Sequence, residues 1–292
     1  MSIDRLQEKI RKLKNPSIIN FDILSDRIPP YLLQEEGSLP KAYGRFCIEL
    51  LDALRVTVPA VRFSFSGMAL LGTDGLCTLA RVLDYAKGLG YYTFLDVPEA
   101  LSAQRAAENA RLLFQEDTLW VCDGLIVSSY IGSDGLKPYI DGLKASGKDL
   151  FVVLRTANRS AAELQDLITG GRLVHQAKAD IADRMGKTHI GRCGFSQIAG
   201  VAPASSTTVL TTMRSKYKNM FLLLDGFDYP NSNAKNCSFA FDQFGHGAAA
   251  CAGNSVVGAW VDDDADEDEY VEAAVQAAER MKKNLTRYVT IL

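Results

Sequence analysis

The sequence predicts an α/β fold, a (β/α)8 TIM barrel, from two observations. Eight short apolar runs recur along the chain, and each is followed by a stretch that suits a helix. The runs are apolar at consecutive positions, which is typical of parallel strands covered by helices on both faces. Eight strand–helix units in 292 residues match the size of one such barrel. A doubly wound open sheet is the alternative fold.

The expected strands follow one another along the whole chain. They cover 17–22, 58–65, 92–97, 124–129, 150–155, 197–202, 220–225 and 248–253, of which the last is alanine-rich. Ahead of them, Ile3, Leu6, Ile10 and Leu13 recur at helical spacing. We therefore expect an N-terminal helix rather than a continuous apolar signal segment.

Polar residues mark the expected helix starts. Asp74, Ser102 and the pair Ser133 and Asp134 each precede an amphipathic stretch, where their side chains would cap the helix. The acidic run 262–274 is interpreted as the start of a helix, because the helix dipole stabilises carboxylates there. A metal-binding run is the alternative interpretation of that segment.

Composition excludes several classes of function. The net charge of −3 gives no basic surface for nucleic acid or an anionic membrane, and no apolar run is long enough to span a bilayer. Without such a run or an apolar signal segment, we expect a cytoplasmic protein. With neither repeats nor flexible linkers, we expect a single domain over 1–292. The six cysteines are scattered without a C-x-x-C pair, so we expect buried free thiols rather than disulfides or a metal site.

The candidate site lies at the carboxyl ends of the strands, where such barrels keep their chemistry. Polar residues that end or follow strands are Asp22, Arg62, Asp96, Ser129, 155–158 and Asp225. A carboxylate in this place binds substrate hydroxyls, pairs with a cation such as Arg62, or caps the next turn.

Two further features are ambiguous from sequence alone. Small residues in the loop 244–254 would let backbone N–H groups approach a phosphate, or would allow tight helix packing. His175 and His189 are expected to be surface or loop histidines, and His246 falls near a strand end.

Four stretches resemble motifs of the orotidine 5′-phosphate decarboxylase family, in its longer bacterial branch. INFDILSDRIP resembles G-L-D-P followed by D-x-x-P, and VPAVRFSFSGMALLGTDGLCTLARVLDYAKGLG resembles the second-strand and helix block. SSYIGSDGLKPYI resembles N-P-Y-x-G-x-D-x-L-x-P-F, and FVVLRTANRSAAELQDL resembles V-R-T-S-N-P-x-A-x-x-x-Q. The motifs occur in order over nearly the whole chain, and the resemblance implies the same (β/α)8 barrel.

The resemblance implies a decarboxylation without metal or cofactor, but the catalytic positions differ. The family uses a lysine ending the second strand and Asp-x-Lys-x-x-Asp ending the third, with the last aspartate lent across a dimer interface. Here Arg62 stands at the first lysine and Asp96 at the first aspartate, whereas Pro98 and Leu101 replace the catalytic lysine and the second aspartate. No lysine occurs anywhere in 88–136, so a shifted alignment does not restore one.

The phosphate-binding motifs differ as well. The family's P-G-x-G-A-Q-G reads DGFDYPN at 225–231, which includes Gly226 and adds two carboxylates. Its S-S-R-G reads GNSV at 253–256, which puts Asn254 in place of the phosphate-binding arginine. Two aspartates without an arginine would repel a phosphate dianion.

The positions that the resemblance assigns to the ribose and base remain polar. They are Asp22, Asp96, Arg155, Thr156 and Asn158. With Arg62, Gly226 and Asn254 they are the expected site residues, and no metal ligand is expected among them.

We therefore expect a barrel of this pyrimidine (UMP) biosynthesis family that has lost its decarboxylation. It would act as a ligand-binding, regulatory or partner subunit for a pyrimidine nucleoside or nucleotide. It would form a homodimer, or a heterodimer with a related barrel, through the mouth where Leu101 lies. The alternative is an active decarboxylase, or a related cofactor-free lyase, that uses Arg62, Asp96 and Glu99. Clustering of the charged side chains in a pocket would favour the enzyme, whereas a mouth filled by Phe63, Phe65 or Leu101 would count against it.

Overall fold

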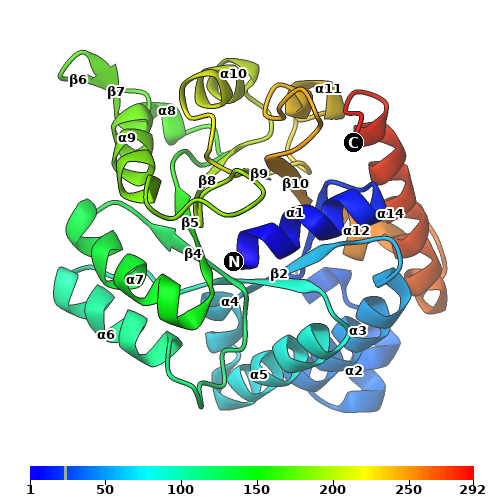
Figure 1. Ribbon diagram of the computed structural model, residues 1–292. Helices are drawn as coiled ribbons and strands as arrows, with labels where there is room; N and C mark the ends of the chain where they lie inside the picture. The colour runs from blue at the N-terminus through cyan, green and yellow to red at the C-terminus, as the bar shows by residue number, and fades with distance from the viewer. Residues whose placement is uncertain (23–24) are drawn as a thin grey trace.

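A closed barrel of eight parallel strands forms the centre of the molecule (Figure 1). The computed structural model describes residues 1–22 and 25–292. The barrel strands are β1 (Ser17–Asn20), β2 (Ala60–Ser64), β3 (Tyr92–Asp96), β4 (Gly124–Ser128), β5 (Asp149–Val153), β8 (Ile198–Pro203), β9 (Leu222–Asp225) and β10 (Ala248–Ala252). Strand β10 pairs in parallel with β1 and closes the barrel. The predicted fold class is confirmed, and each of the eight runs overlaps a barrel strand.

Helices follow the strands and surround the barrel. They are α1 (Ser2–Leu13), α2 (Pro30–Glu36), α3 (Leu39–Leu54), α4 (Phe65–Ala69), α5 (Gly72–Gly88), α6 (Ala103–Leu113), α7 (Ser133–Ser146), α8 (Ala161–Leu164), α9 (Val174–Gly186), α10 (Thr207–Lys216), α11 (Ala234–Ser238), α12 (Asn254–Val257), α13 (Ala259–Asp262) and α14 (Tyr270–Thr286), with 3-10 turns η1 (Ser25–Arg27) and η2 (Glu267–Glu269). A small antiparallel hairpin, β6 (Ile168–Thr169) and β7 (Arg172–Leu173), precedes α9 and was not predicted. No helix in the described part of the chain is long and apolar enough to cross a membrane.

The predicted N-terminal helix closes one end of the barrel. Helix α1 crosses the middle of the ring of strands in Figure 1, and its own side chains Ile3, Leu6 and Ile10 are fully buried. The helix is fixed at strand starts: Gln7 Oε1 accepts a hydrogen bond from the N–H of Gly247, 3.0 Å away and just before β10. Because α1 covers the amino ends of the strands, the carboxyl ends remain for a ligand site.

Aromatic side chains fill the barrel below the carboxyl ends. The rings of Tyr92 and Phe94 lie 4.8 Å apart, and Phe94 meets Phe151 edge-on at the same centroid distance. Gly124 makes room for this packing, since a Cβ atom there would lie 2.9 Å from Tyr92 Oη and 3.1 Å from the Phe94 ring. The packed interior supports the polar residues that end the strands.

The predicted helix starts are correct at one of three positions. Ser102 Oγ accepts a hydrogen bond from the N–H of Arg105 at 3.1 Å and caps α6. Helix α5 begins at Gly72, so Asp74 lies in its first turn instead of capping it. Gly132 takes the cap position of α7, with a φ of 78° that favours glycine, and Ser133 is the first helical residue.

The acidic run 262–274 spans more than one helix start. Asp262 ends α13, the middle of the run forms η2, and α14 begins only at Tyr270. Within 1–22 and 25–292, no group of three or more His, Cys, Asp or Glu side chains is arranged to hold a metal ion.

Two predictions about cysteine and histidine burial were wrong in part. Four free thiols are buried, at Cys47, Cys122, Cys237 and Cys251, but Cys77 is exposed and Cys193 is half-buried. His175 is buried and belongs to α9, so it is neither a surface nor a loop histidine, whereas His189 is buried but lies in the loop between α9 and β8. His175 is held at the start of α9, where its Nδ1 lies 3.0 Å from the carbonyl oxygen of Gln165 and 3.1 Å from Asp166 Oδ1.

Candidate active site

Arg62 is the centre of the polar cluster at the mouth of the barrel. It projects from β2, and its Nε and Nη2 atoms donate to both carboxylate oxygens of Asp96 on β3, at 2.8 and 2.5 Å. Its Nη1 atom donates to Asp225 Oδ1 on β9 at 2.8 Å. The guanidinium is only 12% exposed, so this two-pronged ion pair is largely shielded from water. Two carboxylates thus neutralise the single cation.

The pKa directions follow from this arrangement. Burial would lower the pKa of Arg62, but the charges of Asp96 and Asp225 raise it well above its usual value. Burial also raises the pKa of Asp96, and the charge of Arg62 opposes this effect. Arg62 therefore stays protonated at neutral pH and is unsuited to proton transfer.

Asp22 lies beside this cluster, two residues after β1. Partial burial raises its pKa, the charge of Arg62 lowers it, and that of Asp225 raises it further. Gly67 allows the close approach of α4, since a Cβ atom there would lie 2.7 Å from Asp22 Oδ1. Strands β1, β2 and β9, far apart in sequence, thus place Asp22, Arg62 and Asp225 together.

A cavity of about 260 Å³ opens above these residues. Its lining comes from the ends of β1, β2, β9 and β10: Asn20, Asp22, Arg62, Asp225, Gly226, Asp228, Tyr229, Cys251, Ala252, Gly253 and Asn254. The structure therefore brings together four of the predicted site residues, namely Asp22, Arg62, Gly226 and Asn254. It adds Cys251, whose sulfur lies 4.0 Å from Arg62 Nη1 and which no sequence motif singles out.

Arg155, Thr156 and Asn158 form a separate network. The Arg155 guanidinium donates to both carboxylate oxygens of Asp166 at 2.8 Å, and this partner raises its pKa. Gln165 holds Thr156 by two 2.8 Å hydrogen bonds, and the Thr156 hydroxyl donates to Asn158 Oδ1 at 2.6 Å. Arg155 and Asn158 line a neighbouring cavity of about 620 Å³, which shares only Tyr229 with the Arg62 cavity.

The turn after β3 adds no side chain to the cluster. Leu101 is 83% exposed, and Glu99 is also exposed. The charge of Glu99 acts on Lys178, whose pKa burial lowers to about 8. Glu99 is not one of the residues that line the Arg62 cavity.

Aromatic residues near the strand ends do not block the mouth. Phe63 is buried against Phe21, with ring centroids 5.2 Å apart, and Phe65 meets Trp120 edge-on at 5.0 Å. None of Phe63, Phe65 and Leu101 lines the Arg62 cavity, so none of them fills it.

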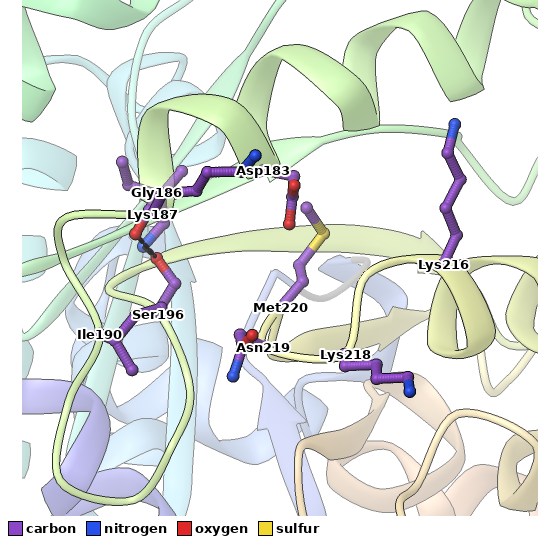
Figure 2. Close-up of a pocket in the computed structure, with 10 residues that line it drawn as sticks. Asp183, Gly186, Lys187, Ile190, Ser196, Lys216, Lys218, Asn219 and Met220 are labelled. Atoms are coloured by element: carbon purple, nitrogen blue, oxygen red, sulfur yellow. Dashed lines mark hydrogen bonds between the residues drawn. The ribbon is translucent and has the colours of Figure 1, made fainter.

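Another cavity, of about 300 Å³, lies at the opposite end of the barrel (Figure 2). Its residues come from the end of α9 and the segments just before β8 and β9, including Lys187, Ser196 and Met220. Figure 2 shows Ser196 facing Gly186, to whose carbonyl oxygen its hydroxyl donates at 3.1 Å. This cavity shares no residue with the mouth and is not the candidate active site.

The curated proteins most similar in sequence that are described below carry the same name. No family model matches the chain. It is 26% identical over 286 residues to orotidine 5′-phosphate decarboxylase of Clostridium novyi, covering 98% of both chains, and 27% identical over 260 residues to that of Rhodopirellula baltica, covering 86% of both.

Solved structures share the fold. A putative orotidine 5′-phosphate decarboxylase from Streptomyces avermitilis superposes with a TM-score of 0.78 at 20% identity, covering 99% of this chain and 95% of its own. A putative orotidine-monophosphate-decarboxylase from Plasmodium yoelii gives 0.80 at 14% identity, covering 98% of both chains. The curated relatives cover nearly the whole chain and the barrel is closed, so the chain is similar to orotidine 5′-phosphate decarboxylases over nearly all of its length.

Proposed function

We propose that this chain has lost the decarboxylation of its family and acts as a ligand-binding, regulatory or partner subunit. One observation carries the proposal: Arg62, at the position of the second-strand lysine, is held between Asp96 and Asp225. The resemblance puts the proton donor in the turn after β3, where this chain has Pro98 and Leu101.

The family reaction needs two free groups that this cluster lacks. A carboxylate must destabilise the departing CO2 group, and an acid must protonate the carbanion that remains. Both oxygens of Asp96 already accept hydrogen bonds from Arg62. Arg62 holds its proton too tightly to give it up near neutral pH. The cluster is thus better suited to binding than to proton transfer.

An active decarboxylase or related cofactor-free lyase is the second candidate. It is favoured by the meeting of Asp22, Asp96 and Asp225 around Arg62 at an unfilled mouth, next to a cavity of about 260 Å³. In that mechanism Arg62 and Asp96 would act together with Asp22. The exposed Glu99, which the sequence adds to this set, lies outside the lining of the cavity.

Incubation with orotidine 5′-phosphate separates the two candidates. The purified chain and its Asp96→Ala variant are each assayed for UMP by chromatography, beside an enzyme-free sample. We expect no UMP above the enzyme-free level from either protein. Turnover by the parent that Asp96→Ala abolishes would overturn the proposal and establish the enzyme.

We also propose that the chain pairs through the mouth of the barrel, as a homodimer or with a related barrel. Large apolar side chains are exposed in the loops after β2, β3 and β4, namely Leu70, Leu101 and Tyr130, which are 89%, 83% and 75% exposed. Burying such side chains against a partner is favourable. Light scattering on the parent and on a Leu70→Asp, Leu101→Asp double variant checks this. We expect the parent to have the mass of a dimer and the double variant that of a monomer. A parent with the mass of a monomer would contradict the homodimer.

A further inference from the structure

We propose that Asp228 occupies the place in the Arg62 cavity where related decarboxylases would bind the phosphate of their ligand. The ligand of this chain is then an unphosphorylated nucleoside. This inference rests on the proposed ligand-binding function and names the class of ligand. It is carried by the contacts of Asp228, the charges that line the cavity, and an unpaired amide oxygen beside them.

The Asp228 carboxylate is bound by groups that could otherwise hold a phosphate. Its Oδ2 atom accepts a hydrogen bond from the N–H of Gly253 at 2.6 Å, and Oδ1 accepts one from the Ser255 hydroxyl. Gly253 and Ser255 directly follow β10, the eighth barrel strand. Loops after the seventh and eighth strands are the usual phosphate site of (β/α)8 barrels. A carboxylate uses the same N–H and O–H donors as a phosphate, so Asp228 competes directly with one.

The loop after β9 is folded to bring Asp228 there. Gly226 has a φ of 73°, and a Cβ atom at this position would lie 2.6 Å from Ala157 Cβ. The N–H of Phe227 donates to the carbonyl oxygen of Cys251 at 3.1 Å, and the Ser232 hydroxyl donates to that of Gly226 at 2.7 Å. These contacts tie the loop to β10 on one side and to itself on the other.

The charges that line the cavity disfavour a phosphate. Asp22, Asp225 and Asp228 contribute carboxylates, and Arg62 is the only Lys or Arg among the described lining residues. That cation is already shared between Asp96 and Asp225. A phosphate dianion would therefore enter a cavity of net negative charge without a free partner. Ribose hydroxyls, in contrast, can donate hydrogen bonds to these carboxylates.

The side-chain oxygen of Asn254 could also accept a hydrogen bond from a ligand. Asn254 Oδ1 is buried and has no hydrogen-bond partner in the described structure. A buried acceptor left unpaired is unfavourable, and a ligand hydroxyl or N–H would satisfy it, whereas a phosphate oxygen would not. Tyr229 also lines the larger cavity beside Arg155.

Binding measurements with matched ligands test the inference. Uridine, orotidine, their 5′-monophosphates and inorganic phosphate are titrated calorimetrically into the parent, Asp228→Gly and Asp228→Asn. Asp117→Asn is the matched control, because this exposed carboxylate lies in the loop between α6 and β4, at the other end of the barrel. We expect the parent to bind a nucleoside at least tenfold more tightly than its monophosphate. Asp228→Gly should reduce that preference at least tenfold, and Asp117→Asn should retain it.

Several results would overturn the inference. They are a parent that prefers the monophosphate, a parent that binds no nucleoside at millimolar concentration, and a preference that both Asp228 variants leave unchanged. If Asp228→Gly does not fold, Asp228→Asn alone decides, because it removes the charge and nearly keeps the shape. Turnover of orotidine 5′-phosphate in the same samples would contradict the proposed function, whereas monophosphate binding without turnover would contradict only the inference about Asp228.

Discussion

Arg62 keeps a positive charge at the mouth of the barrel but is fixed there by two carboxylates. The strand-end positions of Arg62 and Asp96 made their pairing predictable from the sequence. The second bond, to Asp225, was not predictable, because it joins β2 to β9 and depends on the curvature and closure of the barrel. The sequence thus identified the residues but not the geometry that removes their reactivity.

Replacing Arg62 should strongly destabilise the fold. Arg62→Ala would leave Asp96 and Asp225 facing each other without a cation, and breaking a buried ion pair in this way costs about 3–5 kcal/mol. Urea denaturation of the variant and its parent gives the change in the free energy of unfolding. Arg45→Ala is the control, because Arg45 pairs with Glu35 and Glu49 at the surface and its loss should cost much less. Equal losses in the two variants would contradict a structural role for the Arg62 cluster.

Asp149 should give the protein a distinctive pH dependence. It is fully buried at the start of β5, accepts a hydrogen bond from the Tyr92 hydroxyl at 2.7 Å, and has a pKa that burial raises to about 7. Between pH 4 and pH 7 the folded state keeps a proton on Asp149 that the unfolded chain releases. This residue's contribution to stability is therefore present at low pH and is lost as the pH rises through 7.

The Asp149→Asn variant removes that dependence. We expect its free energy of unfolding, relative to the parent, to increase by up to a few kcal/mol from pH 4 to pH 8 and then to level off. Denaturation curves at several pH values measure this difference, with Asp117→Asn as the exposed control. A difference that stays constant over this range would show that Asp149 titrates normally.

Among the elements, the strands were more predictable than the helix boundaries. Consecutive apolar residues marked all eight strands, and burial on both faces explains why even the alanine-rich β10 forms one. The helix starts of α5 and α7 were misplaced because Gly72 and Gly132 adopt left-handed conformations that the sequence does not reveal. Hairpin β6–β7 was missed because its strands have only two residues each and are mostly exposed.

The cap of α6 offers a direct check at this scale. Ser102→Ala removes the acceptor for the N–H of Arg105 and should cost about 1 kcal/mol of stability. Ser133→Ala is the matched control, since Gly132 rather than Ser133 holds the cap position of α7. Thermal or urea unfolding of both variants measures the costs, and an equal cost would show that the Ser102 bond does not stabilise α6.

At the scale of the whole molecule, barrel closure assembles the site from distant segments. The sequence placed Asp22, Arg62 and Asn254 at strand ends, and the barrel brings them to one cavity. It also grouped Arg155 with them, but Asp166 holds that guanidinium beside a different cavity. The hydrogen bond between Asp228 and the N–H of Gly253 was not predictable, because it depends on the conformation of the loop after β9. The single domain over 1–292, the dimer and the cytoplasmic location stay predictions.

Release of CO2 from carboxyl-labelled orotidine 5′-phosphate tests the loss of the family reaction most directly. The assay uses the full chain at high concentration and long incubation, with Asp96→Ala and an enzyme-free sample beside it. Because Arg62 is held by Asp96 and Asp225 and Pro98 replaces the catalytic lysine, we expect the label to be released only at the enzyme-free rate. Release by the parent well above that rate, and its loss in Asp96→Ala, would contradict the account.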